Sequence, residues 1–249
     1  MDIDQFFKEF SVSTSETVPE ALAYNSNTLD AIARASGKSF YVIDYHKRGF
    51  AYVSPSPLFL CGRKPEEVLA LGYHFYEQVM PAEDLEMLLE INRKGFEQFH
   101  SISPEARIQL TITYDFRLIQ PSRRLLMVNQ KLTPIQLTPS GEIWLALCVV
   151  SLSSNSQPGN VFIHINGELH RFHYSFEGKR WHESGLITLS EREKEVLQLS
   201  AEGYSNEEVG NKLCIDINTV KFHKRKLYDK FNVKNIVEAI TFAHNNWLL

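Results

Sequence analysis

The fold of the last quarter of the chain is decided by the stretch TVKFHKRKLYDKF, residues 219–231. At about 100° per residue, Leu227 and Phe231 fall within about 20° of Val220, which predicts a helix with a narrow apolar stripe pointing inward. The side chains that lie between about 100° and 240° around the helix axis from Val220 form the outward face. They are Lys221, Phe222, Arg225 and Lys226.

Positive charge gathers on this helix although the chain as a whole is acidic. The formal net charge at pH 7 is −4, but residues 219–234 contain six lysines and arginines and a single acid, Asp229. The major groove of DNA admits one helix, whose lysines and arginines can reach guanine O6 and N7, while further lysines neutralise phosphates. The stretch therefore predicts a DNA-binding helix, with Phe222 either against a thymine methyl group or as a single surface aromatic.

Helix boundaries are well marked around this stretch. Two capping boxes and one N-cap are expected at the helix starts, namely Ser190 with Glu193, Ser205 with Glu208, and Asp216. Gly203 ends the first helix, and a fourth helix is expected over 235–245. Short helices joined by short turns predict a four-helix domain over 186–249 that contains a helix-turn-helix.

The motifs of this region resemble the LuxR/GerE family of bacterial regulators. They are LSEREKEVL (189–197), GYSNEEV (203–209), TVKFH (219–223) and KFNV (230–233). The resemblance implies that Lys221, Phe222 and Arg225 occupy base-reading positions, with Thr219 and His223 beside them. It also implies that the fourth helix, near Ile236 and Ile240, mediates dimerisation.

The residues expected to contact DNA combine this resemblance with the charge of the helix: Thr219, Lys221, Phe222, His223, Lys224, Arg225, Lys226 and Lys230. Two residues depart from the family pattern. Gly210 stands where an alanine is usual in mid-helix, which costs up to about 1 kcal/mol. Asp216 replaces the usual serine cap, and it adds a negative charge near the expected phosphates.

The first part of the chain has an antiparallel pattern. Strands are expected over 39–45, 50–54, 106–119, 123–138 and 142–152, and helices are expected to open at Pro65 and Pro81. The segment IWLALCVV, residues 143–150, is apolar at every position, which predicts a strand covered on both faces. The N-terminal helix, the hairpin that follows or a second subunit is expected to supply the outer cover.

The stretches CGRKPEEV (61–68) and MPAEDL (80–85), with Gly72 between them, resemble the PAS family. The resemblance implies a five-stranded antiparallel sheet with helices on one face, over 38–153. Between sheet and helices it implies either a small-molecule pocket or a packed core with a dimer surface.

No cofactor is expected in this region, and the residues of any ligand site stay undetermined. Flavin photosensors of the PAS family carry a cysteine shortly after the glycine matched by Gly72. This chain has Tyr73-His74-Phe75-Tyr76 there, so a cysteine–flavin adduct is not expected. A haem would need an axial ligand, for which His74 and His100 are the nearest candidates, and neither carries a motif.

Residues 161–176 predict a β-hairpin with a type I′ turn at Asn166-Gly167. That turn would pair Ile165 with Glu168, His164 with Leu169, and Ile163 with His170. The three histidines of the hairpin, His164, His170 and His173, would then not converge, because side chains alternate between the two faces. No metal site is expected, and the hairpin is expected to pack Val161, Ile163 and Phe172 on the PAS-like domain.

The whole chain is expected to be an α+β protein of 249 residues. The expected parts are a helical segment at 1–37, the PAS-like domain at 38–153, a linker and hairpin at 154–185, and the helix-turn-helix domain at 186–249. The longest apolar run has eight residues, fewer than the roughly 20 of a membrane span, and the acidic N-terminus is unlike a signal peptide. A cytoplasmic protein with reduced, mostly buried cysteines is expected.

Together these features predict a sequence-specific DNA-binding transcription regulator whose PAS-like domain senses a ligand or mediates dimerisation. An output protein controlled by a protein partner, like a response regulator or a sigma factor, stays an alternative. No enzyme is expected, because the chain has no Walker loop, G-x-S-x-G, H-E-x-x-H or cysteine–histidine signature. The expected partners are double-stranded DNA and a second copy of the chain, with RNA polymerase and a small-molecule ligand as further candidates and no membrane.

Overall fold

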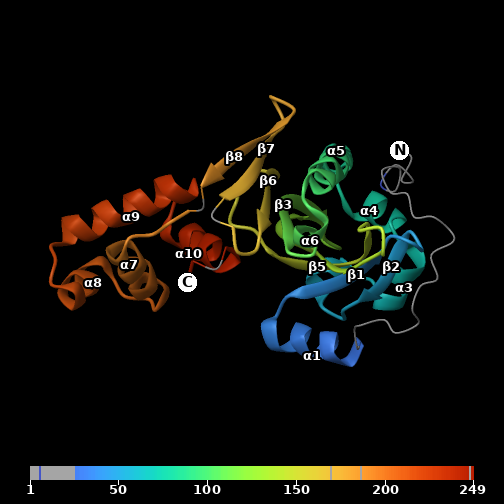
Figure 1. Ribbon diagram of the computed structural model, residues 1–249. Coiled ribbons are helices and arrows are strands. Elements are labelled where there is room, and N and C mark those ends of the chain that lie inside the picture. Colours follow the sequence, from blue (N-terminus) through green and yellow to red (C-terminus); the bar gives the residue numbers. More distant parts are fainter. Residues whose placement is uncertain (1–5, 7–25, 169, 186, 247) are drawn as a thin grey trace. The chain divides into compact units, whose positions relative to one another are not determined.

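The computed structural model describes residues 6, 26–168, 170–185, 187–246 and 248–249. Two compact units make up the chain (Figure 1). The sheet unit comprises Met1–Leu152 with Gln157–Gly185, and the helical unit comprises Ser153–Ser156 with Leu186–Leu249. Of the helical segment expected at 1–37, residues 1–5 and 7–25 lie outside the described residues.

One antiparallel sheet with the strand order β2-β1-β5-β4-β3-β6-β7-β8 runs through the sheet unit. Its strands are β1 Ser39–Asp44, β2 Gly49–Val53, β3 Leu110–Ile119, β4 Leu125–Leu137, β5 Ile143–Leu152, β6 Gly159–Ile165, β7 His170–Ser175 and β8 Arg180–Gly185. The first five form the antiparallel sheet that the PAS resemblance implied, so that prediction is confirmed.

The helices of the sheet unit lie on both faces of the sheet. In chain order they are α1 Ser26–Ser36, α2 Pro57–Leu60, α3 Pro65–Leu71, α4 His74–Val79, α5 Ala82–Ser101 and α6 Pro104–Arg107. Figure 1 shows α4 and α5 on one side of the sheet and α1 on the other. Leu29 and Ala33 of α1 pack in one apolar cluster with Trp144 and Leu145 of β5. Strand β5 is therefore covered on both faces, as expected, and the N-terminal helix supplies the outer cover.

The MPAEDL stretch fixes the start of α5 against the sheet. Asp84 is 1% exposed, and its Oδ2 accepts a hydrogen bond of 2.6 Å from the backbone N–H of Arg117 on β3. The same carboxylate forms an ion pair with the Arg117 guanidinium. This buried contact holds α5 over the sheet, which leaves the space between them to be filled by the side chains of both.

The hairpin expected outside the PAS-like domain instead extends its sheet. Strand β6 pairs with β3, and β8, at the end of the segment 154–185 that was expected to be a linker and hairpin, pairs with β7. Val161 and Ile163 are fully buried and Phe172 packs against the same core, as expected.

The turn of this hairpin differs from the expected one. His164 pairs with Arg171, where a type I′ turn would have paired it with Leu169. Gly167 has φ +89°, but Asn166 keeps a negative φ, so the conformation is not type I′. Asn166 still donates its backbone N–H to Gln109 O. The bond joins Asn166 to the segment that leads into β3, and the β6–β7 pairing has a register two residues away from the expected one.

The helical unit contains α7 Glu191–Ala201, α8 Asn206–Leu213, α9 Ile217–Phe231 and α10 Ile236–Asn245. Both expected capping boxes are formed, and the Asp216 side chain caps α9 as expected by accepting a hydrogen bond from Asn218 N. Two apolar clusters form its core, one around Val196, Val209 and Val220 and one around Leu197, Leu227 and Phe231. Within the described residues, no helix has the length and apolar character needed to cross a membrane.

Candidate nucleic-acid interface and buried cavity

The turn between α8 and α9 sets the position of the expected recognition helix. Gly210 of α8 approaches the turn so closely that a Cβ added there would lie 2.8 Å from Ile215 O. Ile215 in turn donates its backbone N–H to Gly210 O at 3.0 Å. The glycine that departs from the family pattern therefore has a structural reason, because no side chain fits between α8 and this turn.

The inward stripe of α9 is anchored at both ends. Val220 is fully buried and belongs to the cluster with Val196 and Val209. At the other end Phe231 is 3% exposed, and its ring stacks on Phe242 of α10 with 4.7 Å between centroids. The predicted inward stripe is confirmed, and it fixes which face of α9 points away from the unit.

The outward face of α9 offers cations around an exposed aromatic ring. Lys221, Phe222, Arg225 and Lys226 are all exposed, and Phe222 has an exposed fraction of 51%. Lys226 places its Nζ 4.7 Å from the centroid of the Phe222 ring. Within the described part of the chain, Lys221 and Arg225 make no ion pair or side-chain hydrogen bond. Their charges are therefore available to a partner of opposite charge.

Three further predicted DNA contacts lie on the flanks of this face. Thr219, His223 and Lys224 are half-buried. Burial lowers the pKa of Lys224. The Nδ1 atom of His223 is buried and has no hydrogen-bond partner within the described residues. These three side chains therefore lie at the edge of the outward face and are less exposed than Lys221 and Arg225.

Lys230 of α9 is bonded to the start of α7 and to the segment before it. Its Nζ lies 2.6 Å from Glu193 Oε2 and donates to Thr188 O at 3.0 Å. The same Glu193 oxygen accepts from the backbone N–H of Ser190, which closes the capping box of α7. Lys230 is itself exposed, but its ion pair with Glu193 distinguishes it from Lys221 and Arg225, with which the sequence had grouped it.

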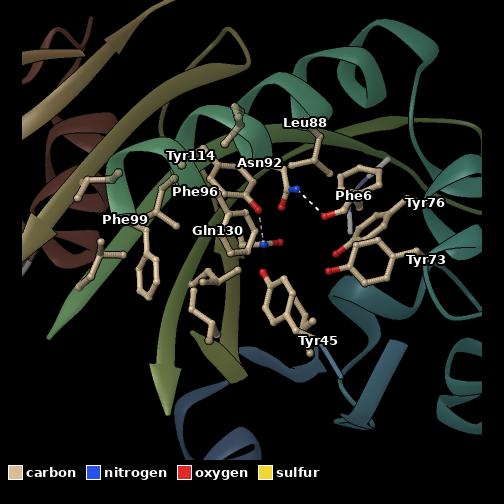
Figure 2. A pocket seen from close by; sticks show the side chains of 18 residues that line it. Phe6, Tyr45, Tyr73, Tyr76, Leu88, Asn92, Phe96, Phe99, Tyr114 and Gln130 are labelled. Atoms are coloured by element: carbon tan, nitrogen blue, oxygen red, sulfur yellow. Dashed lines mark hydrogen bonds between the residues drawn. The ribbon is translucent and has the colours of Figure 1, made fainter. Parts of the chain in front are cut away.

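A cavity of about 50 Å³ lies between the sheet and α5 in the sheet unit. Its lining residues are mostly apolar or aromatic, as Figure 2 shows for Phe6, Phe96 and Phe99. The polar groups of the lining are four tyrosines and two amides: Tyr45, Tyr73, Tyr76, Tyr114, Asn92 and Gln130. The sequence did not predict that these six polar residues line one cavity, because they come from five separate segments of the chain.

The histidines considered as metal or haem ligands do not line this cavity. His74 forms a hydrogen bond with Glu77, and His100 forms one with Glu142, each of 2.9 Å and at the protein surface. His164 and His173 share the outer face of β6 and β7 without being opposite each other, as expected. No three His, Cys, Asp or Glu side chains within the described residues are grouped as metal ligands would be.

Known proteins that are similar in sequence to this chain match it in the helical unit. The family model described as bacterial regulatory proteins, luxR family, matches residues 187–243. LiaR of Bacillus subtilis, a transcriptional regulatory protein, is 41% identical over 81 residues, which cover 32% of this chain and 36% of LiaR. The oxygen regulatory protein NreC of Staphylococcus carnosus is 41% identical over 61 residues, 24% of this chain and 28% of NreC. The chain thus matches about a third of these relatives' length.

A solved complex of Vibrio cholera VqmA with ligand and DNA is 16% identical and covers 90% of this chain and 89% of its own, with a TM-score of 0.36. The family match, the two capping boxes and the anchored α9 all concern the same segment. Residues 187–243 are therefore a domain of the luxR family of bacterial regulatory proteins.

Proposed function

We propose that the protein is a sequence-specific transcription regulator that inserts α9 into the major groove of DNA. The observation that carries this proposal is the contrast between the two faces of α9. One face is buried through Val220, Leu227 and Phe231. The other exposes Lys221 and Arg225, which have no ion pair or side-chain hydrogen bond within the described residues. The exposed ammonium and guanidinium groups can donate hydrogen bonds to guanine O6 and N7 in the major groove.

The other predicted residues take supporting roles in this proposal. Phe222 offers an apolar surface to a thymine methyl group, and Lys226, held over the Phe222 ring, is directed to a phosphate. Thr219, His223 and Lys224 lie at the edge of the contact. Lys230 acts chiefly within the helical unit through its ion pair with Glu193.

The sheet unit is proposed to act as the sensor of this cytoplasmic regulator. A buried cavity with polar groups on its wall supports control by a small molecule over control by a protein partner alone. We assign dimerisation to α10, as the family resemblance implies. Ile236 and Ile240 are partly buried against the unit's own core, whereas Val237 is 69% exposed. The dimer contact is therefore centred on Val237.

The experiment begins with selection of binding sites by the full chain from a pool of random DNA duplexes. The affinity of Lys221→Ala and Arg225→Ala for the selected duplex is then measured at fixed salt. Each variant is expected to weaken specific binding about 5- to 150-fold, the equivalent of about 1–3 kcal/mol. Lys194→Ala, which removes an exposed cation of α7, is the matched control and is expected to bind normally. Normal binding by both α9 variants would overturn the proposal.

A further inference from the structure

The cavity in the sheet unit is lined by hydrogen-bonding groups but by no charged side chain. Burial raises the pKa of Tyr45, Tyr73, Tyr76 and Tyr114, so their hydroxyl groups stay protonated. A charged molecule that entered the cavity would lose its hydration without meeting an opposite charge. The lining therefore selects for an uncharged molecule.

A hydrogen-bond network orders the polar groups at one side of the cavity. Tyr41 donates its hydroxyl proton to Gln130 Oε1 at 2.5 Å, so the 2.6 Å contact between Tyr41 and Tyr76 uses the proton of Tyr76. Gln130 Nε2 donates to the Tyr114 hydroxyl oxygen at 2.5 Å. Tyr114 therefore keeps its own proton, which has no acceptor within the described residues.

A second polar group faces the same space from α5. Asn92 donates its Nδ2 to the backbone oxygen of Phe6 at 2.7 Å, and no hydrogen bond to its Oδ1 is formed within the described part of the chain. The Asn92 side chain is directed toward the same space as the tyrosine hydroxyl groups (Figure 2). Within the described residues, Tyr114 thus offers a donor to the cavity and Asn92 an acceptor, beside the hydroxyl groups of Tyr45, Tyr73 and Tyr76.

The size of the cavity reflects the presence of Phe6. A volume of about 50 Å³ exceeds the roughly 10–15 Å³ that one water needs, but it is well below the roughly 150 Å³ of an apolar cavity that binds benzene. Phe6 is 3% exposed, and its ring lies 5.2 Å from the ring of Tyr73 and 6.5 Å from that of Tyr76. An aromatic ring from a distant part of the sequence therefore already fills part of this aromatic site.

We propose that the cavity binds a small uncharged molecule with one aromatic ring and a hydrogen-bonding substituent, and that Phe6 stands in the place of that ring in the free protein. The substituent accepts a hydrogen bond from Tyr114 and donates one to Asn92. This inference rests on the proposed function, because it identifies the chemical class of signal that the sensor unit receives. Binding of the molecule moves Phe6 out of the cavity.

Three probes of nearly equal size and shape test the choice of chemical class. Benzamide, benzoate and benzylammonium are titrated separately into the full chain by isothermal titration calorimetry at neutral pH. Benzamide is expected to bind at least about tenfold more tightly than either ion, because the ions lose hydration on entry. Equal or tighter binding of an ion, or no binding of benzamide, would overturn the proposal.

Variants test the place of Phe6 and the role of Tyr114. Phe6→Ala is expected to raise the affinity for benzamide at least about tenfold, because the probe then displaces no side chain. If Phe6 were only a wall of the cavity, its removal would lower the affinity or leave it unchanged. Phe6→Leu, which keeps an apolar side chain in the core, is expected to shift the affinity in the same direction.

Tyr114→Phe keeps the ring and removes the donor, so the affinity for benzamide is expected to fall about tenfold. Tyr204→Phe, in the helical unit, is the matched control. The affinity of the same variants for the selected duplex is measured without any probe. If the Phe6 and Tyr114 variants bind the duplex normally but do not change the affinity for benzamide, only this inference is contradicted. If the α9 variants bind the duplex normally, the proposed function is contradicted.

Discussion

Glu193 combines two stabilising contacts in the helical unit. Its carboxylate, 4% exposed, accepts from the backbone of Ser190 at 2.8 Å and from the ammonium of Lys230 at 2.6 Å. Burial by itself raises the pKa of Glu193, but the hydrogen bonds from Lys230 and Ser190 outweigh it and lower the pKa. The stabilisation is therefore present above the ordinary glutamate pKa and is lost as the pH falls below it.

Replacement of Lys230 by methionine tests this assignment. The variant leaves a buried carboxylate without its counter-charge, and the free energy of unfolding of the helical unit is expected to fall by about 1–3 kcal/mol at pH 7. Urea denaturation followed by circular dichroism measures the change. In Lys194→Met an exposed pair with Glu191 is lost, and a change below about 0.5 kcal/mol is expected. Equal effects of both variants would contradict the structural role of Lys230.

Gly210→Ala tests the close approach of α8 to the turn before α9. Helix propensity alone would stabilise α8 by up to about 1 kcal/mol. The added Cβ would instead meet Ile215 O at 2.8 Å, so the turn must shift and the Ile215–Gly210 hydrogen bond is strained. A lower melting temperature is expected in a thermal unfolding experiment. An increase of the size that propensity predicts would show that the turn yields without cost.

At the scale of the elements, the sequence allowed the helical unit to be predicted more fully than the sheet unit. Capping boxes and N-caps act within a few residues, so Ser190, Ser205 and Asp216 gave the helix starts that the structure has. In the β6–β7 hairpin, by contrast, the turn also makes a contact far away in sequence, the hydrogen bond from Asn166 N to Gln109 O. Local turn preference at Asn166-Gly167 could not reveal that contact, and the predicted register was two residues off.

The cavity could not be predicted from the sequence either, because it also depends on contacts between segments that are far apart in the chain. Its lining is assembled from α4, α5, β1, β3, β4, β5 and β6 and their neighbouring residues, and from Phe6, and no periodic pattern connects these segments. The aromatic run Tyr73-His74-Phe75-Tyr76 was visible, but only the packing of α4 shows that Tyr73 and Tyr76 face the cavity while His74 lies at the surface.

The outer face of the β6–β7 pair is expected to make the sheet unit sensitive to acid. Burial first, and then the charges of Lys131 and Arg171, lower the pKa of His164, while Glu168 opposes the shift. Burial, Arg171 and His182 lower that of His173. The unfolded chain therefore takes up protons before the folded chain does, and stability is expected to fall as the pH drops below about 6.5.

Urea denaturation between pH 8 and pH 5, followed by tryptophan fluorescence, measures this dependence. The wild-type free energy of unfolding is expected to decrease toward low pH. The decrease is expected to be shallower in His164→Gln and shallowest in His164→Gln combined with His173→Gln. An unchanged slope in the double variant would show that other groups control the acid response.

At the scale of the whole molecule, the proposed recognition of DNA by two copies is tested on α10. Val237 is 69% exposed on a helix whose other apolar side chains pack inward. Val237→Glu is expected to leave the fold intact and to change the complex with the selected duplex from two protein chains to one, as measured by analytical ultracentrifugation. His244→Gln, at an exposed position of the same helix, is expected to keep two chains. A two-chain complex of Val237→Glu would place the dimer contact elsewhere.

The central claim is that α9 presents its Lys221, Phe222 and Arg225 side to DNA bases, and cleavage by an iron chelate tethered at position 222 tests it most directly. The experiment uses Phe222→Cys in a chain whose exposed Cys214 is replaced by serine, because Cys61 and Cys148 are buried. A chain with Lys194→Cys in the same background carries the chelate on α7 instead. Cleavage centred on the selected bases from position 222, and not from position 194, is the predicted result. Cleavage from position 194 alone, or from neither position while the duplex stays bound, would contradict the account.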